Sequence, residues 1–139
     1  MSFVFFTDRD LGKRFPEILT AAGLAVKRHD DLFPPNCPDE EWLARVGRAG
    51  WIAITHNARI RYMPNERDAV IRHGVSLLVV VGKAPLKDLA ESFIATLPRI
   101  EAFLEKHRAP VIAKVYRASP EDLARDTRSG GSITLWYPK

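Results

Sequence analysis

The stretch Phe3-Val4-Phe5-Phe6-Thr7-Asp8, at residues 3–8, decides the fold of this chain. Its apolar residues follow one another without alternation, which predicts a strand that is buried on both faces, as in a parallel sheet. Asp8 stands directly at the carboxyl end of this strand. In open α/β sheets, ligands and catalytic groups collect at that end.

A second apolar run, Trp51-Ile52-Ala53-Ile54, ends in a similar way, in Thr55-His56-Asn57. The acidic segment Asp39-Glu40-Glu41 lies between the two runs. Two strand ends that carry Asp or Asn, with carboxylates between them, indicate a small acidic pocket of the kind that holds Mg²⁺.

Signals for strands and helices alternate along the chain. This alternation predicts an α/β fold with a mainly parallel, doubly wound sheet flanked by helices and joined by right-handed crossovers. The expected strands are Phe3–Thr7, Leu24–Arg28, Trp51–Thr55, Ser76–Val81 and Val111–Tyr116. The expected helices are Pro16–Ala22, Asp39–Arg48 with Asp39 as its N-cap, Asn65–His73 and Leu86–His107, and His29–Pro38 is expected to be a loop.

The end of the chain differs from the rest, so residues 1–118 are expected to form one domain and residues 119–139 an extension. Pro120–Asp126 fits a helical turn capped by Ser119, and Ser129-Gly130-Gly131-Ser132 reads as a flexible break. Ile133–Tyr137 is predicted to be a strand, which either pairs antiparallel with a sheet edge or is exposed and binds a partner.

The composition suits a globular domain, because 46% of the 139 residues are hydrophobic. No run is long and apolar enough to cross a membrane, and the first residues lack the layout of a secretory signal. A single cysteine, Cys37, excludes an internal disulfide framework, so we expect a reducing, cytoplasmic setting.

The net charge of +4 becomes informative because positive side chains gather near the two strand ends. Arg9, Lys13 and Arg14 follow the first end, and Arg59, Arg61 and Arg67 follow the second. A basic rim around an acidic centre suits a polyanionic substrate that is reached through a bound metal ion.

The order of these features resembles that of the PIN-like nucleases. The shared features are Asp8 after a first strand, Asp39 at the start of a helix after a proline-rich loop, and Thr55-x-Asn57 after a third strand. More narrowly, the chain resembles a small VapC-type toxin branch in Phe5-Phe6-Thr7-Asp8-Arg9-Asp10-Leu11-Gly12, Asp39-Glu40-Glu41-Trp42, Gly50-Trp51 and Arg59-Ile60-Arg61. The resemblance spans roughly Phe3 to Tyr116.

The resemblance implies a Mg²⁺- or Mn²⁺-dependent ribonuclease that is paired with an antitoxin, and a homodimer is a further expectation. Hard divalent cations are held by carboxylates, and they assist the hydrolysis of a phosphodiester. The implied metal ligands are Asp8, Asp39 and Asn57, with Thr55 as a further catalytic residue. The implied RNA contacts come from Arg9, Arg59, Arg61 and Lys83.

Asn57 departs from the family pattern, which commonly has Asp at this position. An asparagine keeps one oxygen ligand but lacks the negative charge, which should weaken metal binding. Three acidic residues are candidates for an additional role near the metal: Asp10, Glu40 and Glu66. Asp10 and Glu66 are the two that could restore the missing charge.

Two other functions remain open from the sequence. A PIN-like fold that binds RNA or protein without cleavage is one, because of Asn57. A haloacid-dehalogenase-type phosphatase is the other, with Asp8 as nucleophile and Asp10 as acid and base. Such phosphatases need a further acidic pair at a later strand end, where this chain has Gly82-Lys83. The histidines His29, His73 and His107 lack ligand spacing and are expected on the surface.

Overall fold

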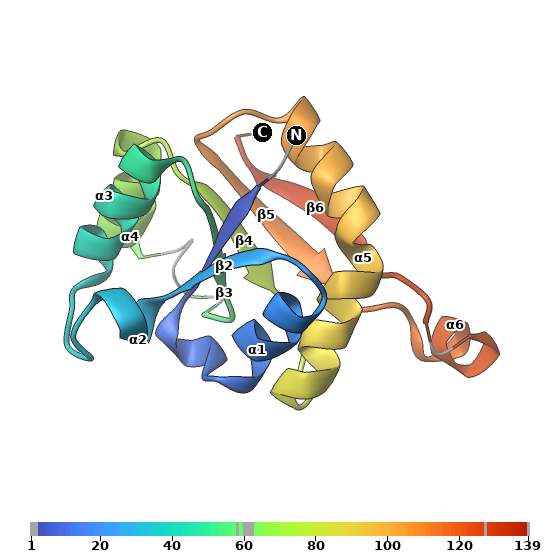
Figure 1. Cartoon of the computed structure of the whole chain (residues 1–139). Helices are drawn as coiled ribbons and strands as arrows, with labels where there is room; N and C mark the ends of the chain where they lie inside the picture. Colours follow the sequence, from blue (N-terminus) through green and yellow to red (C-terminus); the bar gives the residue numbers. More distant parts are fainter. Residues whose placement is uncertain (1–2, 58, 60–62, 127, 139) are drawn as a thin grey trace.

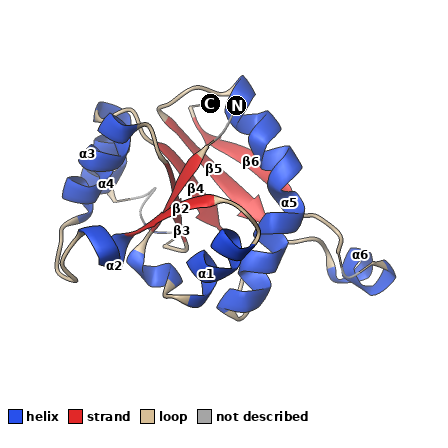
Figure 2. Ribbon diagram, in the orientation of Figure 1, coloured by secondary structure: helices blue, strands red, loops and turns tan. Residues whose placement is uncertain are grey.

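A sheet of six strands runs through the described part of the protein, with helices on both of its faces (Figure 1; Figure 2). The structure is a computed structural model, and it describes residues 3–57, 59, 63–126 and 128–138. The strands are β1 (Val4–Thr7), β2 (Ala25–Arg28), β3 (Ile52–Thr55), β4 (Ser76–Val80), β5 (Val111–Tyr116) and β6 (Ser132–Tyr137). Their order in the sheet is β2-β1-β3-β4-β5-β6, and only β6 is antiparallel to its neighbour.

The helical segments are the 3₁₀ turn η1 (Arg9–Leu11), α1 (Arg14–Ala21), α2 (His29–Leu32), α3 (Asp39–Ala49), α4 (Pro64–Arg72), α5 (Leu86–Lys106) and α6 (Pro120–Arg125). Helix α6 has no buried residue and stands away from the sheet (Figure 1). Helices α1 and α5 pack on one face of the sheet, whereas α3 and α4 pack on the other. The predicted α/β fold with a mainly parallel sheet flanked by helices is therefore confirmed.

Strand β1 contributes side chains to a hydrophobic core on each face of the sheet, as its unalternating apolar sequence predicts. Phe5 packs under α1 and α5, where its ring meets Phe93 edge-on at 5.7 Å between ring centroids. Phe6 points to the other face and stacks on Trp42 of α3 at 5.2 Å. Because successive side chains of a strand point to opposite faces, each phenylalanine fixes one helical layer against β1.

Two local expectations for the segment before α3 are wrong. Residues 29–32 form the short helix α2, although three prolines downstream favour a loop throughout. Asp39 is the first residue of α3, and Pro38 holds the N-cap position with an extended backbone. The carboxylate of Asp39 therefore caps no backbone amide, and it accepts a hydrogen bond of 2.9 Å from Nε1 of Trp42.

The end of the chain joins the main sheet, because β6 pairs along β5. Residues 129–132, expected to be a flexible break, are held by specific contacts. The amide of Gly131 donates to Oγ1 of Thr96 at 2.9 Å, and the guanidinium of Arg99 donates to the Gly131 carbonyl. A Cβ atom at Gly131 would lie 1.7 Å from the Tyr116 carbonyl oxygen, so this crossing requires glycine. The predicted cap at Ser119 is present and accepts from the amide of Asp122.

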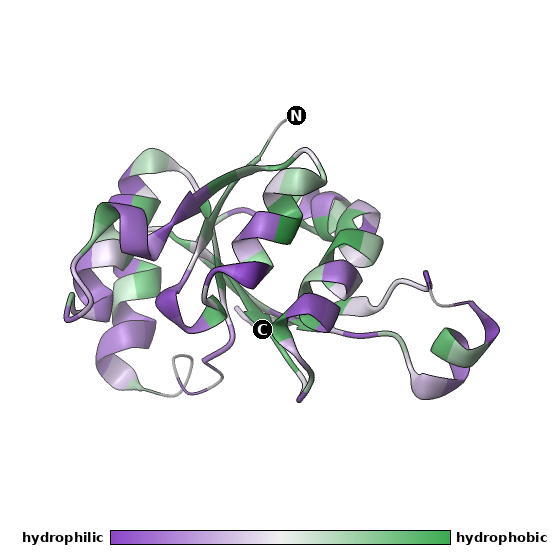
Figure 3. Cartoon of the chain, turned by 60° about the horizontal axis from the view of Figure 1, so that its bottom comes forward, coloured by the Kyte–Doolittle hydropathy of each residue, from purple (hydrophilic) through white to green (hydrophobic). Residues whose placement is uncertain are grey.

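Hydrophobic residues concentrate on the central strands, and polar residues on the outer sides of the helices (Figure 3). Within the described ranges, no helix combines the length and apolar character that crossing a membrane requires.

Candidate active site

A hollow opens at the carboxyl edge of the sheet, where β1 and β3 end side by side. The two strands are parallel, with Thr7 opposite Ile54, and the amide of Asp8 donates to the Ile54 carbonyl at 2.9 Å. The hollow has a volume of about 560 Å³, and its described lining is Asp8, Arg9, Asp10, His29, Pro35, Cys37, Asp39 and Asn57. The structure thus brings Asp8, Asp39 and Asn57 together at one edge.

Asp8 is buried at the centre of this arrangement, between the end of β1 and the start of η1. One carboxylate oxygen, Oδ1, accepts from the amide of Arg9 at 2.7 Å, and the other, Oδ2, accepts from the hydroxyl of Thr55 at 2.8 Å. Burial raises the pKa of Asp8 to about 7, and the nearby charge of Asp10 adds to the rise. The two hydrogen bonds offset part of this effect, because they stabilise the ionised form.

Asp10 lies beside Asp8 and shares its partner. Its Oδ2 is 3.4 Å from the hydroxyl of Thr55, and its Oδ1 accepts from the amide of His56 at 3.3 Å. A hydroxyl has one proton, so Thr55 donates to one carboxylate at a time, and the shorter bond is to Asp8. Loss of solvent around the carboxylate raises the pKa of Asp10, although the residue as a whole is exposed.

Asp39 and Asn57 approach from the two other sides of the hollow. Asp39 is half-buried in the first turn of α3, and its charge contributes to the raised pKa values of Asp8 and Asp10. The side-chain oxygen of Asn57 accepts from the backbone amide of Arg59 at 3.1 Å, and the backbone amide of Asn57 donates to Oγ1 of Thr55 at 3.1 Å. Asn57 therefore shapes the loop after β3 and holds the Thr55 hydroxyl in place.

Neither of the other acidic candidates, Glu40 and Glu66, lines the hollow. Glu40 forms an ion pair with Arg72, which ties α3 to α4. Glu66 lies half-buried in the first turn of α4, and it is absent from the described lining. Of the two residues that could offset the missing charge at Asn57, only Asp10 is therefore at the hollow.

The expected RNA-binding residues occupy the rim in different ways. Arg9 lines the hollow, and its guanidinium donates to the Pro35 carbonyl at 2.8 Å. Arg59 is exposed directly after Asn57, and Lys83 is exposed after β4 at the same edge of the sheet. Arg61 lies outside the described residues.

The expectation that His29 lies on the surface is wrong. Its side chain is 3% exposed, and its ring packs against Phe6 and Phe33 at the wall of the hollow. Burial lowers the pKa of His29, so the neutral ring is favoured. The sequence does contain a signal for this placement, because His29 directly follows β2, as Asp8 follows the adjacent β1.

The carboxylates of this hollow fit a small, hard cation. Asp8 and Asp10 form no ion pair with Lys or Arg in the described part of the chain, and the charge of Asp10 raises the cost of ionising Asp8. Among the described residues, no three side chains of His, Cys, Asp or Glu are placed so that they could hold a metal ion as a three-ligand set. Mg²⁺ does not need one, since it commonly binds through one or two carboxylates and keeps several waters.

Comparisons with known proteins show the family of the chain. Residues 3–82 match the family model described as "PIN like domain", and this range contains Asp8, Asp10, Asp39 and Asn57. The chain is similar to "Putative ribonuclease VapC45" of Mycobacterium tuberculosis (strain ATCC 25618 / H37Rv). The two are 30% identical over 101 residues, which cover 68% of this chain and 73% of that protein. No solved structure matches the chain.

Proposed function

Because the chain belongs to the PIN-like domain family, we propose that it is an endoribonuclease that hydrolyses RNA with the aid of Mg²⁺ or Mn²⁺. The observation that carries this proposal is the pair of carboxylates, Asp8 and Asp10, on either side of the Thr55 hydroxyl. Two unpaired carboxylates at converging strand ends suit a divalent cation and a phosphodiester better than a neutral ligand.

Asp8 and Asp10 would hold the ion, with Asp39 facing them from α3. When bound, such an ion neutralises negative charge on the phosphate and supplies a nucleophilic water at neutral pH. The geometry supports Asp10 as the source of the charge that Asn57 lacks, because it lies beside Asp8 and Glu66 does not line the hollow. This favours a working nuclease over an inactive binding module.

The other side chains of the hollow position these carboxylates. Thr55 and the Arg9 amide each donate to a different oxygen of Asp8, so its carboxylate is held in one orientation. Trp42, from the hydrophobic core, donates to one oxygen of Asp39, Oδ1. Carboxylates that are already oriented need little reorganisation when an ion and a phosphate arrive.

RNA would approach along the basic rim. Arg59 and Lys83 are exposed at the edge of the sheet that carries the hollow, and Arg61 follows Arg59 closely in the sequence. Arginine and lysine bind the phosphates of single-stranded RNA with little dependence on sequence. The match to the PIN-like family gives no support to the phosphatase alternative.

We further propose that the protein is the toxin of a toxin–antitoxin pair, in line with its similarity to a VapC protein. Induced expression of the wild-type protein in a bacterial host should then arrest growth. Asp8→Asn should abolish the arrest, and co-expression of the cognate antitoxin should relieve it.

Cleavage of labelled single-stranded RNA by the purified protein tests the ribonuclease proposal. We expect cleavage with Mn²⁺ or Mg²⁺, none with excess chelator, and a loss of at least 100-fold in Asp8→Asn. Glu40→Gln is a matched control, because it removes a carboxylate from α3 that pairs with Arg72 outside the hollow. Cleavage that persists in Asp8→Asn, or that needs no metal, would refute the proposal.

A further inference from the structure

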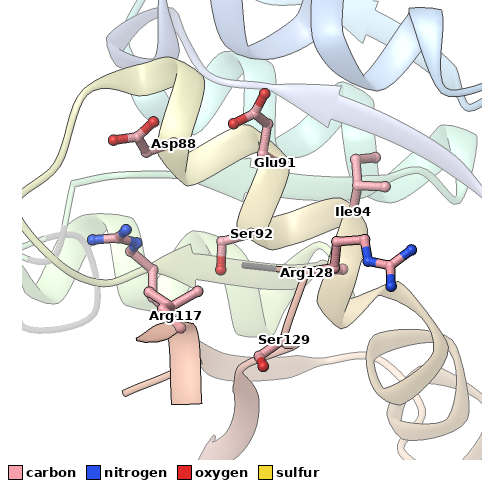
Figure 4. Close-up of a pocket in the computed structure, with 9 residues that line it drawn as sticks. Asp88, Glu91, Ser92, Ile94, Arg117, Arg128 and Ser129 are labelled. Carbon is pink, nitrogen blue, oxygen red and sulfur yellow. The ribbon is translucent and has the colours of Figure 1, made fainter. Parts of the chain in front are cut away.

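A second cleft lies between α5 and the segment of residues 117–131, which we call the arm and which includes α6. It has a volume of about 640 Å³, and its described lining is Asp88, Glu91, Ser92, Ile94, Ala95, Arg117, Leu123, Arg128 and Ser129. Figure 4 shows the carboxylates of Asp88 and Glu91 on α5, with Arg117 and Ser129 on the arm side. Nothing in the proposed catalytic chemistry uses this cleft.

The arm is fixed to the body on the far side of the cleft. A Cβ atom at Gly130 would lie 2.7 Å from the Ala95 carbonyl oxygen, so the arm crosses α5 in close contact. The hydroxyl of Ser129 donates to the Asp122 carbonyl at 3.1 Å, which closes the arm on itself. The cleft is therefore shaped by backbone contacts as well as by side chains.

Arg117 links this cleft to the acidic hollow. It follows β5 at the carboxyl edge, and its side chain passes close to Gly82, since a Cβ atom built on Gly82 would lie 3.9 Å from Cδ of Arg117. The carbonyl of Gly82 is 2.8 Å from Nε2 of His56, whose amide donates to Asp10. Three strand spacings separate the ends of β1 and β5, which is about 14 Å. A few nucleotides of single-stranded RNA can span that distance.

The guanidinium of Arg117 has unused binding capacity. Its Nε is buried without a hydrogen-bond partner, and no ion pair joins Arg117 to an acidic group within the described ranges. A guanidinium is a fork of donors that matches the oxygens of a phosphate. A phosphate at Arg117 would lie at the mouth of the cleft that faces Gly82 and the hollow.

The interior of the cleft suits the base that belongs to such a phosphate. Ile94, Ala95 and Leu123 offer an apolar surface to the flat face of a base. Asp88 and Glu91 are acceptors only when ionised, so they select a base that offers hydrogen-bond donors. Glu91 also pairs with Lys87, one turn before it on α5, and its carboxylate keeps further lone pairs beyond that contact. Cytosine, adenine and guanine carry an exocyclic amino group with two N–H donors, whereas uracil has no amino group and offers a single ring N–H.

We propose that this cleft is a nucleotide subsite of the RNA-binding surface. Arg117 binds a backbone phosphate, and the carboxylates of Asp88 and Glu91 accept hydrogen bonds from the amino group of the attached base. This inference rests on the proposed ribonuclease function and adds a preference for amino-bearing bases at a position a few nucleotides from the scissile bond.

Binding of fluorescent oligo(C), oligo(A) and oligo(U) to the full-length protein without divalent metal tests the subsite. The wild type should bind the first two about fivefold to tenfold more tightly than oligo(U), since a correct base contact contributes a discrimination of that order. Arg117→Ala should weaken the binding of all three and reduce the slope of log K against log salt by about 0.7.

The double variant Asp88→Ala with Glu91→Ala should remove the preference without weakening the binding of oligo(U). Arg48→Ala and Glu105→Ala are the matched controls, because both residues are exposed and lie outside the two cavities described. Equal binding of the three oligonucleotides by the wild type, or an Arg117→Ala variant that behaves as Arg48→Ala, would overturn the subsite. Metal-dependent cleavage that is lost in Asp8→Asn would still stand, so failure of the subsite and failure of the ribonuclease proposal are separable.

Discussion

The hydroxyl of Thr55, at the end of β3, donates a hydrogen bond of 2.8 Å to Oδ2 of Asp8, at the end of β1. This bond joins two residues that lie 47 positions apart in the sequence, and it stabilises the ionised form of a buried carboxylate. Thr55 is itself fully buried, so no water takes over its role if the hydroxyl is removed.

The first prediction follows from this bond. Thr55→Val keeps the shape of the side chain but removes the donor, so the pKa of Asp8 should rise further and RNA cleavage at pH 7 should fall about tenfold. The pH profile of cleavage should shift to higher pH by about one unit, because a hydrogen bond to a charged group contributes roughly 1.5–3 kcal/mol. Thr55→Ser retains the hydroxyl and should behave as wild type. A valine variant with an unshifted profile would separate Thr55 from the ionisation of Asp8.

The second prediction concerns stability against pH in the metal-free protein. The pKa of Asp8 is about 7 in the folded protein against an ordinary value of 3.8. The folded state therefore keeps a proton that the unfolded chain releases, and the stability that depends on this proton is complete below pH 4. It is lost as the pH rises from about 4 to about 7, at up to roughly 1.4 kcal/mol per pH unit.

Urea unfolding between pH 4 and pH 8 measures this effect. Asp8→Asn should flatten the decline, since the amide does not titrate. Asp68→Asn is the control, because Asp68 is an exposed carboxylate of α4. Parallel curves for wild type and Asp8→Asn would mean that Asp8 has an ordinary pKa.

The third prediction concerns the residue that departs from the family pattern. Asn57→Asp keeps an oxygen to accept from the Arg59 amide and adds a negative charge at the hollow. At an effective dielectric constant near 20, unit charges about 4 Å apart interact by roughly 4 kcal/mol, before desolvation and repulsion between carboxylates reduce it. We expect tighter Mn²⁺ binding and faster cleavage. Asn65→Asp, which adds the same charge on the exposed start of α4, should change neither. Equal changes in the two variants would point to a general effect of charge.

The fourth prediction concerns the crossing from the arm to β6. Gly131→Ala should destabilise the protein by about 3 kcal/mol, because the new methyl group would collide with the Tyr116 carbonyl and displace the bond to Thr96. Thermal unfolding measures this loss, with Ser132→Ala as the exposed neighbouring control. A melting temperature equal to that of Ser132→Ala would show that the crossing tolerates a side chain.

The order of strands and helices could be predicted from the sequence, because each element is specified by the residues of its own segment. The unalternating run at residues 3–7 predicts a strand buried on both faces, and the structure places Phe5 and Phe6 in two separate cores. The position of Asp8 at the edge follows directly, since it is the next residue. The sequence leaves two interpretations of the last strand open, and β6 adopts the antiparallel pairing with an edge of the sheet.

The composition of the hollow depends on tertiary contacts that no local pattern contains. The sequence leaves open whether Asp10 or Glu66 adds a carboxylate to the hollow. In the structure the η1 turn brings Asp10 to Thr55, whereas Glu66, on α4, does not line the hollow. The role of Asp39 does not follow from its position in the sequence. An acidic residue at the start of a helix predicts a cap, but here the carboxylate of Asp39 accepts its hydrogen bond from the indole N–H of Trp42. The burial of His29 depends on aromatic rings from three other segments.

Calorimetric titration of Mn²⁺ into the protein at pH 7.5 tests the proposed metal centre in the hollow most directly. We predict a site in the wild type that Asp8→Asn removes, that Asp10→Asn weakens, and that Glu66→Gln leaves unchanged. Mn²⁺ binding of equal affinity and stoichiometry in the wild type and in Asp8→Asn would contradict a metal centre held by Asp8.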